Sequence, residues 1–155
     1  MPSVAPMNSL TEEYGLMTEL FDLMQQEQAL LVAADIDGLT ELTARKTPLV
    51  QRLAQLSRSR HAALGAAGHP AREEGMNDWL AAEGDEAAAA LWSQLLEVTR
   101  AAKELNRVNG MLVNKHLAHT QGALNTLRPP AQAGNFYGPS GQTTSSSSSR
   151  RFVIG

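Results

Sequence analysis

The sequence predicts an all-α protein, and three observations support this prediction. Alanine occurs 23 times and leucine 21 times in 155 residues, whereas valine and isoleucine together occur only 9 times. Straight-chain side chains lose little freedom in a helix, while β-branched side chains favour strands. Apolar residues also recur at steps of three and four over three long stretches, which is the period of one helix face. We therefore expect an elongated antiparallel bundle of three long helices plus one short helix.

The composition along the chain indicates one domain with a tail. A chain of 155 residues suits a single core. We expect a disordered start over residues 1–8, a helical bundle over residues 9–128 and a flexible Gly/Pro/Ser-rich tail over residues 129–155. The tail ends in a basic and apolar peptide, residues 150–155, which is either a docking peptide that adds to a sheet edge or an end without a role.

The first predicted helix begins at Ser9, with Glu12 completing a capping box three residues later. Two adjoining apolar rows follow, so this helix should contact two neighbours. The main row contains Leu10, Tyr14, Met17, Phe21, Met24, Gln28 and Leu31, and the flanking row contains Leu16, Leu20, Leu23 and Leu30. Near Gly38 the pattern is interrupted, and Asp37 is the expected cap of a second helix that runs to about Leu64.

Glycine and proline mark the next connection and the start of the last helix. Residues 65–84 contain four glycines and one proline, which predicts a loop around one short helix bearing Met76, Trp79 and Leu80. Asp85 then opens the longest element. Because no proline occurs between Asp85 and Pro129, about 43 residues could form one continuous helix.

Charges are strongly partitioned along the chain. The first 44 residues contain eight acids and no lysine or arginine, and residues 45–60 contain five bases and no acid. If the two segments are antiparallel neighbours, their opposite charges favour this pairing over other registers. Beyond Glu104 every charged side chain is a lysine or an arginine, which gives this segment a local charge of +5. These bases form either a surface for an acidic partner or a group that interacts favourably with the negative end of the helix dipole near a helix C-terminus.

Several classes of chemistry have no support in the sequence. There is no cysteine, no nucleophile elbow and no phosphate-binding glycine loop, so we expect no enzyme, no disulfide and no cofactor. His116 and His119 share a helix face but lack nearby acids on that helix, and Asp35-x-Asp37 lacks the other ligands of a calcium loop, so we expect no metal. Five dispersed bases do not indicate nucleic acid, and no segment indicates a secretory signal or membrane insertion. A cytoplasmic protein is expected.

The last third of the final helix carries the features of a partner-binding surface. After Asn109 the main seam becomes polar, and a second apolar row strengthens beside it, with members Val113, Leu117, Leu124 and Leu127. Such a shift is expected where a helix packs in its own bundle first and then offers a face to another chain. With Asn109 and Leu112, these residues are the candidate substrate-binding set. Two alternatives remain: the row is covered by the chain itself, or it pairs with a second copy in a self-associating coiled-coil adaptor.

Asn109 and Gly110 are unusual inside a long helix, since a glycine there costs about 1 kcal/mol relative to alanine. Three explanations are open. The backbone of a neighbour approaches closely at this point, the seam asparagine fixes the register of the helices, or the pair is a tolerated defect.

Three segments in order resemble FlgN-type flagellar export chaperones. They are Leu105-Asn106-Arg107-Val108-Asn109-Gly110-Met111-Leu112, the stop Leu127-Arg128-Pro129, and Tyr137-Gly138-Pro139-Ser140-Gly141-Gln142-Thr143 ahead of the basic and apolar end. The acidic first helix with Glu27, followed by Asp35 and Lys46 at a hairpin spacing, is also similar to that family.

This resemblance implies a cytosolic chaperone of the flagellar type III export system. It would hold the hook–filament junction proteins FlgK and FlgL by their C-terminal helical segments, packed on the last third of the final helix. The tail carrying Tyr137 would contact the export-gate protein FlhA, unless that tyrosine folds back onto the bundle. Burying four leucine-class side chains supplies on the order of 6–12 kcal/mol before the costs of ordering and association. Such binding needs no ATP site.

Overall fold

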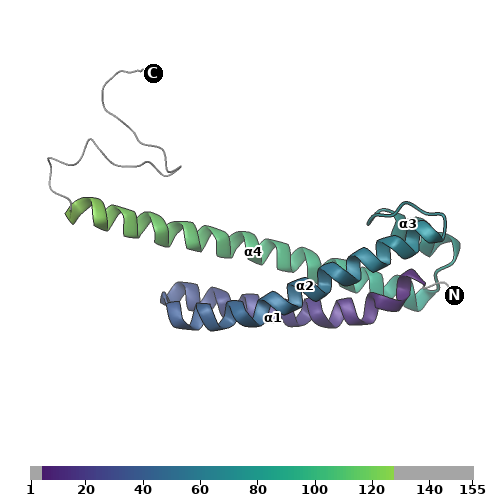
Figure 1. Ribbon diagram of the computed structural model, residues 1–155, viewed down its shortest axis with the longest axis horizontal. Helices are drawn as coiled ribbons and strands as arrows, with labels where there is room; N and C mark the ends of the chain where they lie inside the picture. The colour runs from purple at the N-terminus through teal and green to yellow at the C-terminus, as the bar shows by residue number, and fades with distance from the viewer. Residues whose placement is uncertain (1–4, 128–155) are drawn as a thin grey trace, which may run out of the picture. The chain divides into compact units, whose positions relative to one another are not determined.

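The computed structural model describes residues 5–127, and within this range every regular element is a helix (Figure 1). In chain order the elements are η1 (Pro6–Ser9), α1 (Leu10–Ala33), α2 (Ile36–Ala66), α3 (Gly75–Ala82) and α4 (Glu86–Leu127). The prediction of an all-α fold with three long helices and one short helix is confirmed. The chain divides into two compact units, Met1–Val113 and Asn114–Gly155, and the described part of the second unit is the last stretch of α4.

The start of α1 differs from the sequence prediction. Ser9 makes no capping hydrogen bond to the backbone, and its hydroxyl instead donates to Glu13 Oε2 at 2.6 Å. Glu12 accepts hydrogen bonds from Arg52 on α2. The predicted capping box is therefore wrong, because both carboxylates of the first turn serve tertiary contacts. A 3₁₀ helix, Pro6–Ser9, begins within residues 1–8, the segment predicted to be disordered, and its first residue Pro6 is buried.

Asp35, and not the predicted Asp37, caps α2. Its Oδ1 accepts a hydrogen bond of 2.9 Å from the backbone N–H of Gly38. A Cβ atom at Gly38 would lie 2.8 Å from Asp35 Oδ2, so the glycine allows the carboxylate to approach the helix start. Ala34, with a φ of 55°, ends α1 in the left-handed conformation typical of helix C-termini. The break between the helices thus takes only two residues.

The main core lies where α3 meets the first halves of α1 and α4 and the end of α2. Its buried members are Leu10, Leu64, Met76, Trp79, Ala88, Trp92 and Leu95. The prediction of one short helix bearing Met76, Trp79 and Leu80 within the Gly/Pro-rich segment is confirmed by α3, in which Met76 and Trp79 are buried. Asp85 also acts as expected, because its Oδ1 accepts a 2.8 Å hydrogen bond from Ala88 N–H at the start of α4.

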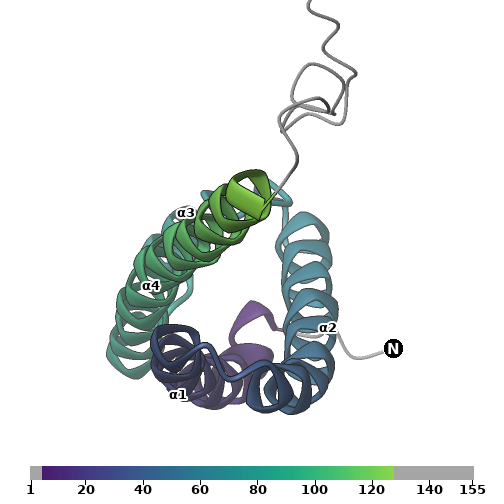
Figure 2. The ribbon, with the colours of Figure 1, turned by 90° about the vertical axis from the view of Figure 1, so that its left-hand side faces the viewer.

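Ion pairs between α1 and α2 confirm the predicted pairing of the acidic and basic segments. From one end of the hairpin to the other, the shortest N–O distances are 2.9 Å for Lys46–Glu27, 2.8 Å for Arg52–Glu12 and 3.0 Å for Arg60–Glu13. Within the first unit, Figure 2 shows α2 and α4 on either side of α1. A second small cluster, Leu20, Met24 and Ala102, joins α1 to α4 farther along.

Candidate protein-binding surface

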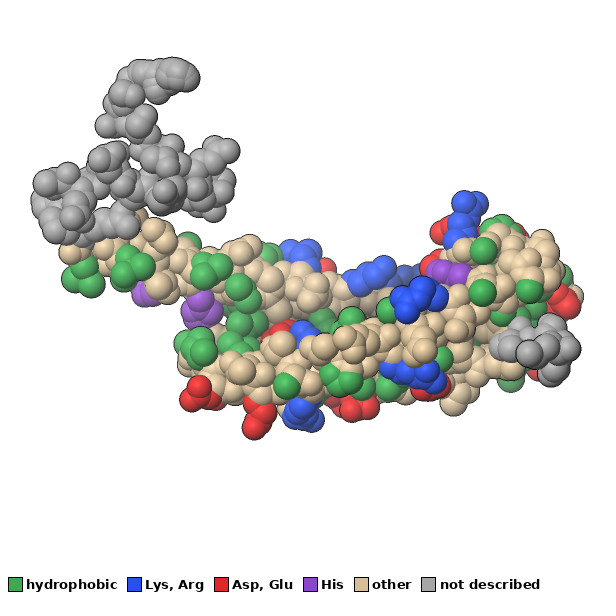
Figure 3. Space-filling model, in the orientation of Figure 1, with side chains coloured by type: hydrophobic (Ala, Val, Ile, Leu, Met, Phe, Trp, Pro, Cys, Tyr) green, Lys and Arg blue, Asp and Glu red, His purple; other side chains and the backbone are tan. Residues whose placement is uncertain are grey.

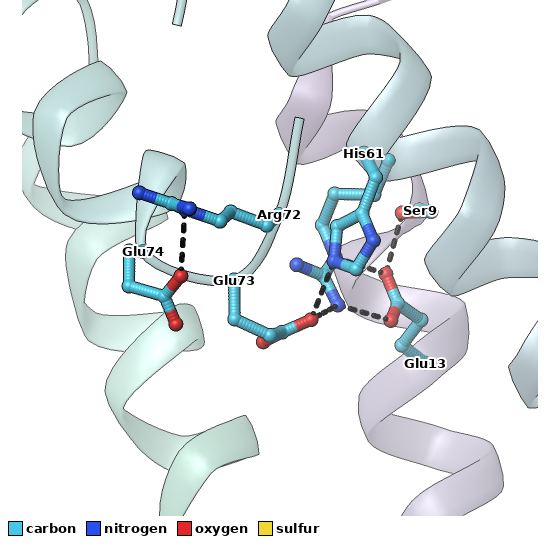
Figure 4. A network of polar contacts seen from close by, with 7 residues as sticks. Ser9, Glu13, His61, Arg72, Glu73 and Glu74 are labelled. Atoms are coloured by element: carbon cyan, nitrogen blue, oxygen red, sulfur yellow. Dashed lines mark hydrogen bonds and ion pairs between the residues drawn. The ribbon is translucent and has the colours of Figure 1, made fainter. Parts of the chain in front are cut away.

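A buried polar network ties α1, α2 and the loop before α3 together (Figure 4). The guanidinium of Arg60 donates to Glu13 at 3.0 and 3.1 Å and to Glu73 at 2.8 Å. The side chains of Arg60 and Glu13 are only 3% and 4% exposed, and the guanidinium also lies 4.8 Å from the centre of the Trp92 ring. His61 Nε2 lies 2.8 Å from Glu73 Oε1. The charge partition of the sequence predicted that α1 and α2 pair, but no pattern indicated that Arg60 and Glu13 would be buried together or that Glu73 would join them.

Hydrogen bonds within the network shift the pKa values of Glu73 and Arg60. Burial acts to raise the pKa of Glu73, but hydrogen bonds from Arg60 and His61 outweigh it and hold that pKa below the usual value. For Arg60, burial acts to lower the pKa, and the hydrogen bonds to Glu13 and Glu73 outweigh it, so the pKa is raised. Both carboxylates of the network are paired with Arg60, whose Nη1 atom is buried without a hydrogen-bond partner, and this pairing across α1, α2 and the loop indicates a structural role.

Asn109 lies inside the bundle, although the sequence placed it among the substrate-binding candidates. Its Nδ2 donates to the Met24 carbonyl and to Glu27 Oε1, both at 3.0 Å, and the residue is only 3% exposed. Glu27 is also paired with Lys46, so the side chains of Glu27, Lys46 and Asn109 link α1, α2 and α4. The geometry therefore favours the register-fixing explanation of Asn109. Close backbone approach does not explain Gly110, since a Cβ atom there would meet nothing within 4 Å.

The other predicted residues of the first unit lie at its last turn. Leu112 is half-buried, whereas Val113 is 41% exposed. Met111, which the sequence prediction did not include, is 58% exposed. Its sulfur accepts a hydrogen bond of 3.0 Å from Arg107, and Arg107 in turn pairs with Glu104.

The described part of the second unit exposes three leucines on helix α4. Leu117, Leu124 and Leu127 are 62%, 54% and 82% exposed, and we call these three residues the leucine strip. Steps of seven and three place them on one face of the helix. Figure 3 shows hydrophobic side chains gathered along this part of α4. Tyr137, predicted to contact the export gate, lies outside the described residues, as does the tail.

Other kinds of site are not found in the described range. Residues 5–127 contain no group of three or more histidine or acidic side chains placed to hold a metal ion. None of the helices there has the length and hydropathy needed to span a membrane. What this part of the chain presents is a packed helical unit followed by a helix face rich in exposed leucines, which is typical of all-α proteins that bind other proteins.

Comparison with known proteins identifies the family. The family model described as FlgN protein matches residues 4–145, and the chain belongs to the FlgN family. FlgN is a flagellar chaperone family and not an enzyme family. The prediction of a FlgN-type protein without enzymatic activity is thereby confirmed.

Curated relatives cover most of the chain. It is 27% identical over 141 residues to a flagella synthesis protein FlgN of Yersinia enterocolitica, covering 90% of this chain and 89% of the relative. It is 29% identical over 131 residues to the protein of the same name from Salmonella typhimurium, with 83% of each chain covered. The Proteus mirabilis protein is 26% identical over 136 residues, with 86% of each covered. Comparison with solved structures found no match.

Proposed function

We propose that this protein is a cytoplasmic export chaperone that binds the hook–filament junction proteins FlgK and FlgL and delivers them to the flagellar type III export gate. The observation that supports it most directly is the exposed leucine strip on the last stretch of α4. Membership of the FlgN family supports the flagellar chaperone role. We place the C-terminal helical segments of FlgK and FlgL on this strip.

The strip suits a binding partner that is itself an amphipathic helix. An unassembled filament-type subunit exposes such a segment, which would otherwise associate with other copies. Leucines at helical spacing can cover its apolar face, in the way that grooves and helix faces recognise anchors at i, i+3, i+4 and i+7. Ordering the segment offsets much of the gain from burial, so the complex can be moderate in affinity and dissociate without a nucleotide.

Hydrogen exchange with and without a C-terminal peptide of FlgK or FlgL tests the location of the surface. We expect slower exchange over residues 114–127 on peptide binding, because the added helix would suppress opening of this stretch. The hairpin end around Val32 provides an internal control, since it also exposes an apolar side chain, at 67%. Protection confined to that end or to α2 would move the binding surface away from the leucine strip.

Light scattering separates this function from the self-associating adaptor. A chaperone that keeps the strip for a foreign segment should have a molar mass that is independent of its concentration. A mass that doubles with concentration, and falls back in a Leu117→Asp/Leu124→Asp variant, would support self-association through the strip instead.

Docking at FlhA through Tyr137 is the second part of the proposal. A tyrosine flanked by glycine offers a large amphipathic anchor with few rotatable bonds. Tyr137→Ala should weaken binding to the cytosolic domain of FlhA and reduce export, while leaving FlgK binding unchanged. Phe152→Ala, which removes another aromatic side chain from the tail, is the matched control. Loss of FlgK binding in Tyr137→Ala would instead make the tyrosine part of the folded structure.

A further inference from the structure

A groove in the first unit lies over α1, between α2 and α4. It has a volume of about 290 Å³, just below the range of about 300–1,000 Å³ typical of small-molecule sites. Its floor includes Met17 and Met24 of α1, and its walls include Val50 of α2 and Ala102 of α4. Val50 is 48% exposed, so the groove is open to solvent. We call it the α2–α4 groove.

The geometry of the α2–α4 groove fits a helix. Met17 and Met24 are seven residues apart on α1, so the floor extends over two helical turns, or about 10 Å. Ala102 on the α4 wall is small enough for another backbone to come close. Methionine side chains adapt to differently shaped partners, which suits a groove that accepts apolar side chains at helical spacing. A helix placed here would add a fourth member to the three long helices, an arrangement typical of helical bundles.

The charges around the groove are cationic, although the whole chain has a net charge of −3. Lys46 and Lys103 line the groove from α2 and α4, and no carboxylate is among the described residues that line it. Lys46 is already paired with Glu27. Lys103 is exposed and has no ion-pair partner within residues 5–127. An apolar floor beside an unpaired ammonium group favours an occupant that has both apolar side chains and carboxylates.

No helix within residues 5–127 presents a row of exposed apolar side chains together with carboxylates. The residues after Glu104 include no acid, so neither the tail nor the end of α4 from a second copy matches the lysines. The acidic helix α1 buries most of its apolar face, including Leu20, Leu23 and Met24, and Val32 at its end is its one exposed large apolar side chain, so α1 of a second copy offers no row of apolar side chains at helical spacing. Charge complementarity therefore points to a different protein.

We propose that the α2–α4 groove binds an acidic amphipathic helix of a partner protein, with apolar side chains on the methionine floor and carboxylates facing Lys103. This surface is separate from the leucine strip and does not depend on the proposed binding of FlgK and FlgL. The chaperone would then be able to hold two helical segments at once, from one partner or from two.

The experiment uses a fluorescent reporter in the groove. Because the chain has no cysteine, Val50→Cys gives a single labelling site for an environment-sensitive dye on the otherwise complete protein. The probe is a designed helical peptide of 20 residues with a leucine and alanine face flanked by glutamates. Its sister peptide has lysine at every glutamate position. We expect the acidic peptide to bind at least tenfold more tightly than the basic one at low salt, with a smaller ratio at high salt.

Reversing the charge of Lys103 tests whether this side chain contacts the carboxylates of the peptide. Lys103→Glu should weaken the acidic peptide at least fivefold and strengthen the basic peptide. Arg58→Glu is the matched control, because it makes the same charge change at an exposed position of α2 that does not line the groove. It should leave both affinities within twofold. Leu117→Asp/Leu124→Asp should also leave them unchanged, so failure of this proposal is distinct from failure of the chaperone proposal.

Three results would overturn the proposal. Equal affinity for the acidic and basic peptides would show that the groove does not select carboxylates. An equal effect of Lys103→Glu and Arg58→Glu would show that the selection is by overall charge. A dye signal that changes with protein concentration in the absence of peptide would identify a second copy as the occupant.

Discussion

Replacing Leu117 and Leu124 together by aspartate should remove most of the affinity for the C-terminal segment of FlgK or FlgL. The two side chains are 62% and 54% exposed in the free protein, so a partner helix can bury that surface. Complete burial of a leucine is worth about 1.5–3 kcal/mol, which scaled to the exposed fractions gives about 1.7–3.5 kcal/mol for the pair. This corresponds to a roughly 20- to 300-fold increase in the dissociation constant. Each aspartate adds the cost of desolvating a carboxylate against an apolar surface.

The assay is calorimetric titration of the full chain with the C-terminal segment of FlgK or FlgL. The double substitution should leave the unfolding temperature nearly unchanged, since exposed positions contribute little to stability. Ala71→Asp/Ala81→Asp is the matched control, because it places two aspartates at exposed apolar positions around α3, at the opposite end of the first unit from Val113. It should leave the dissociation constant within about twofold, an expectation based on the small effects of distant surface changes.

A dissociation constant within threefold of the parent in the Leu117→Asp/Leu124→Asp variant would refute the location of the surface. Equal weakening by the two double variants would refute the reasoning itself, because the loss would then follow from added negative charge and not from the buried leucines.

Three further predictions concern stability. Arg60→Met should lower the free energy of unfolding by about 3–5 kcal/mol in urea titrations, because it leaves the buried Glu13 carboxylate without its cationic partner and with only the Ser9 hydroxyl donating to it; a loss below 1 kcal/mol would show that water reaches that carboxylate. Gly110→Ala should raise the free energy of unfolding by about 0.5–1 kcal/mol, since the helix gains a better former and a Cβ atom meets nothing within 4 Å; a decrease would reveal a close neighbour. The lowered pKa of Glu73 means that its carboxylate stabilises the folded state above the ordinary value of 4.5 and that this stability is lost as the pH falls through the lowered pKa. Glu73→Gln should therefore lose less stability than the parent between about pH 5 and pH 3; parallel pH profiles would contradict the role of the Arg60 and His61 hydrogen bonds.

The fold could be predicted from the sequence wherever a local pattern determines the structure. Apolar spacing gave the long helices, glycine and proline placed the connection around α3, and Asp85 marked the start of α4. The opposed charges of the first two helices also predicted their pairing, which Lys46–Glu27 and Arg52–Glu12 confirm. These features depend on residues that are close in sequence or on charge sums over whole segments.

The details that escaped prediction depend on contacts between distant residues. Ser9 and Glu12 form a capping box by spacing alone, but Arg52 takes the Glu12 carboxylate and Glu13 takes the Ser9 hydroxyl. Asn109 was grouped with exposed neighbours because spacing does not show that a carbonyl of Met24 lies within hydrogen-bonding distance. The role of the leucine strip remains a prediction, since spacing and exposure identify a face and not its partner.

The make-up of the main core has a consequence for synthesis on the ribosome. Leu10, near the beginning of the chain, is fully buried against a group that includes Met76, Trp79 and Leu95. The α1–α2 hairpin can form as soon as both segments have emerged, because its ion pairs need no later residue. Its apolar face, however, stays open until the ribosome has made the first turns of α4. A nascent chain that stalls before Leu95 would thus expose the apolar faces of helices that are not yet packed, and such faces promote aggregation.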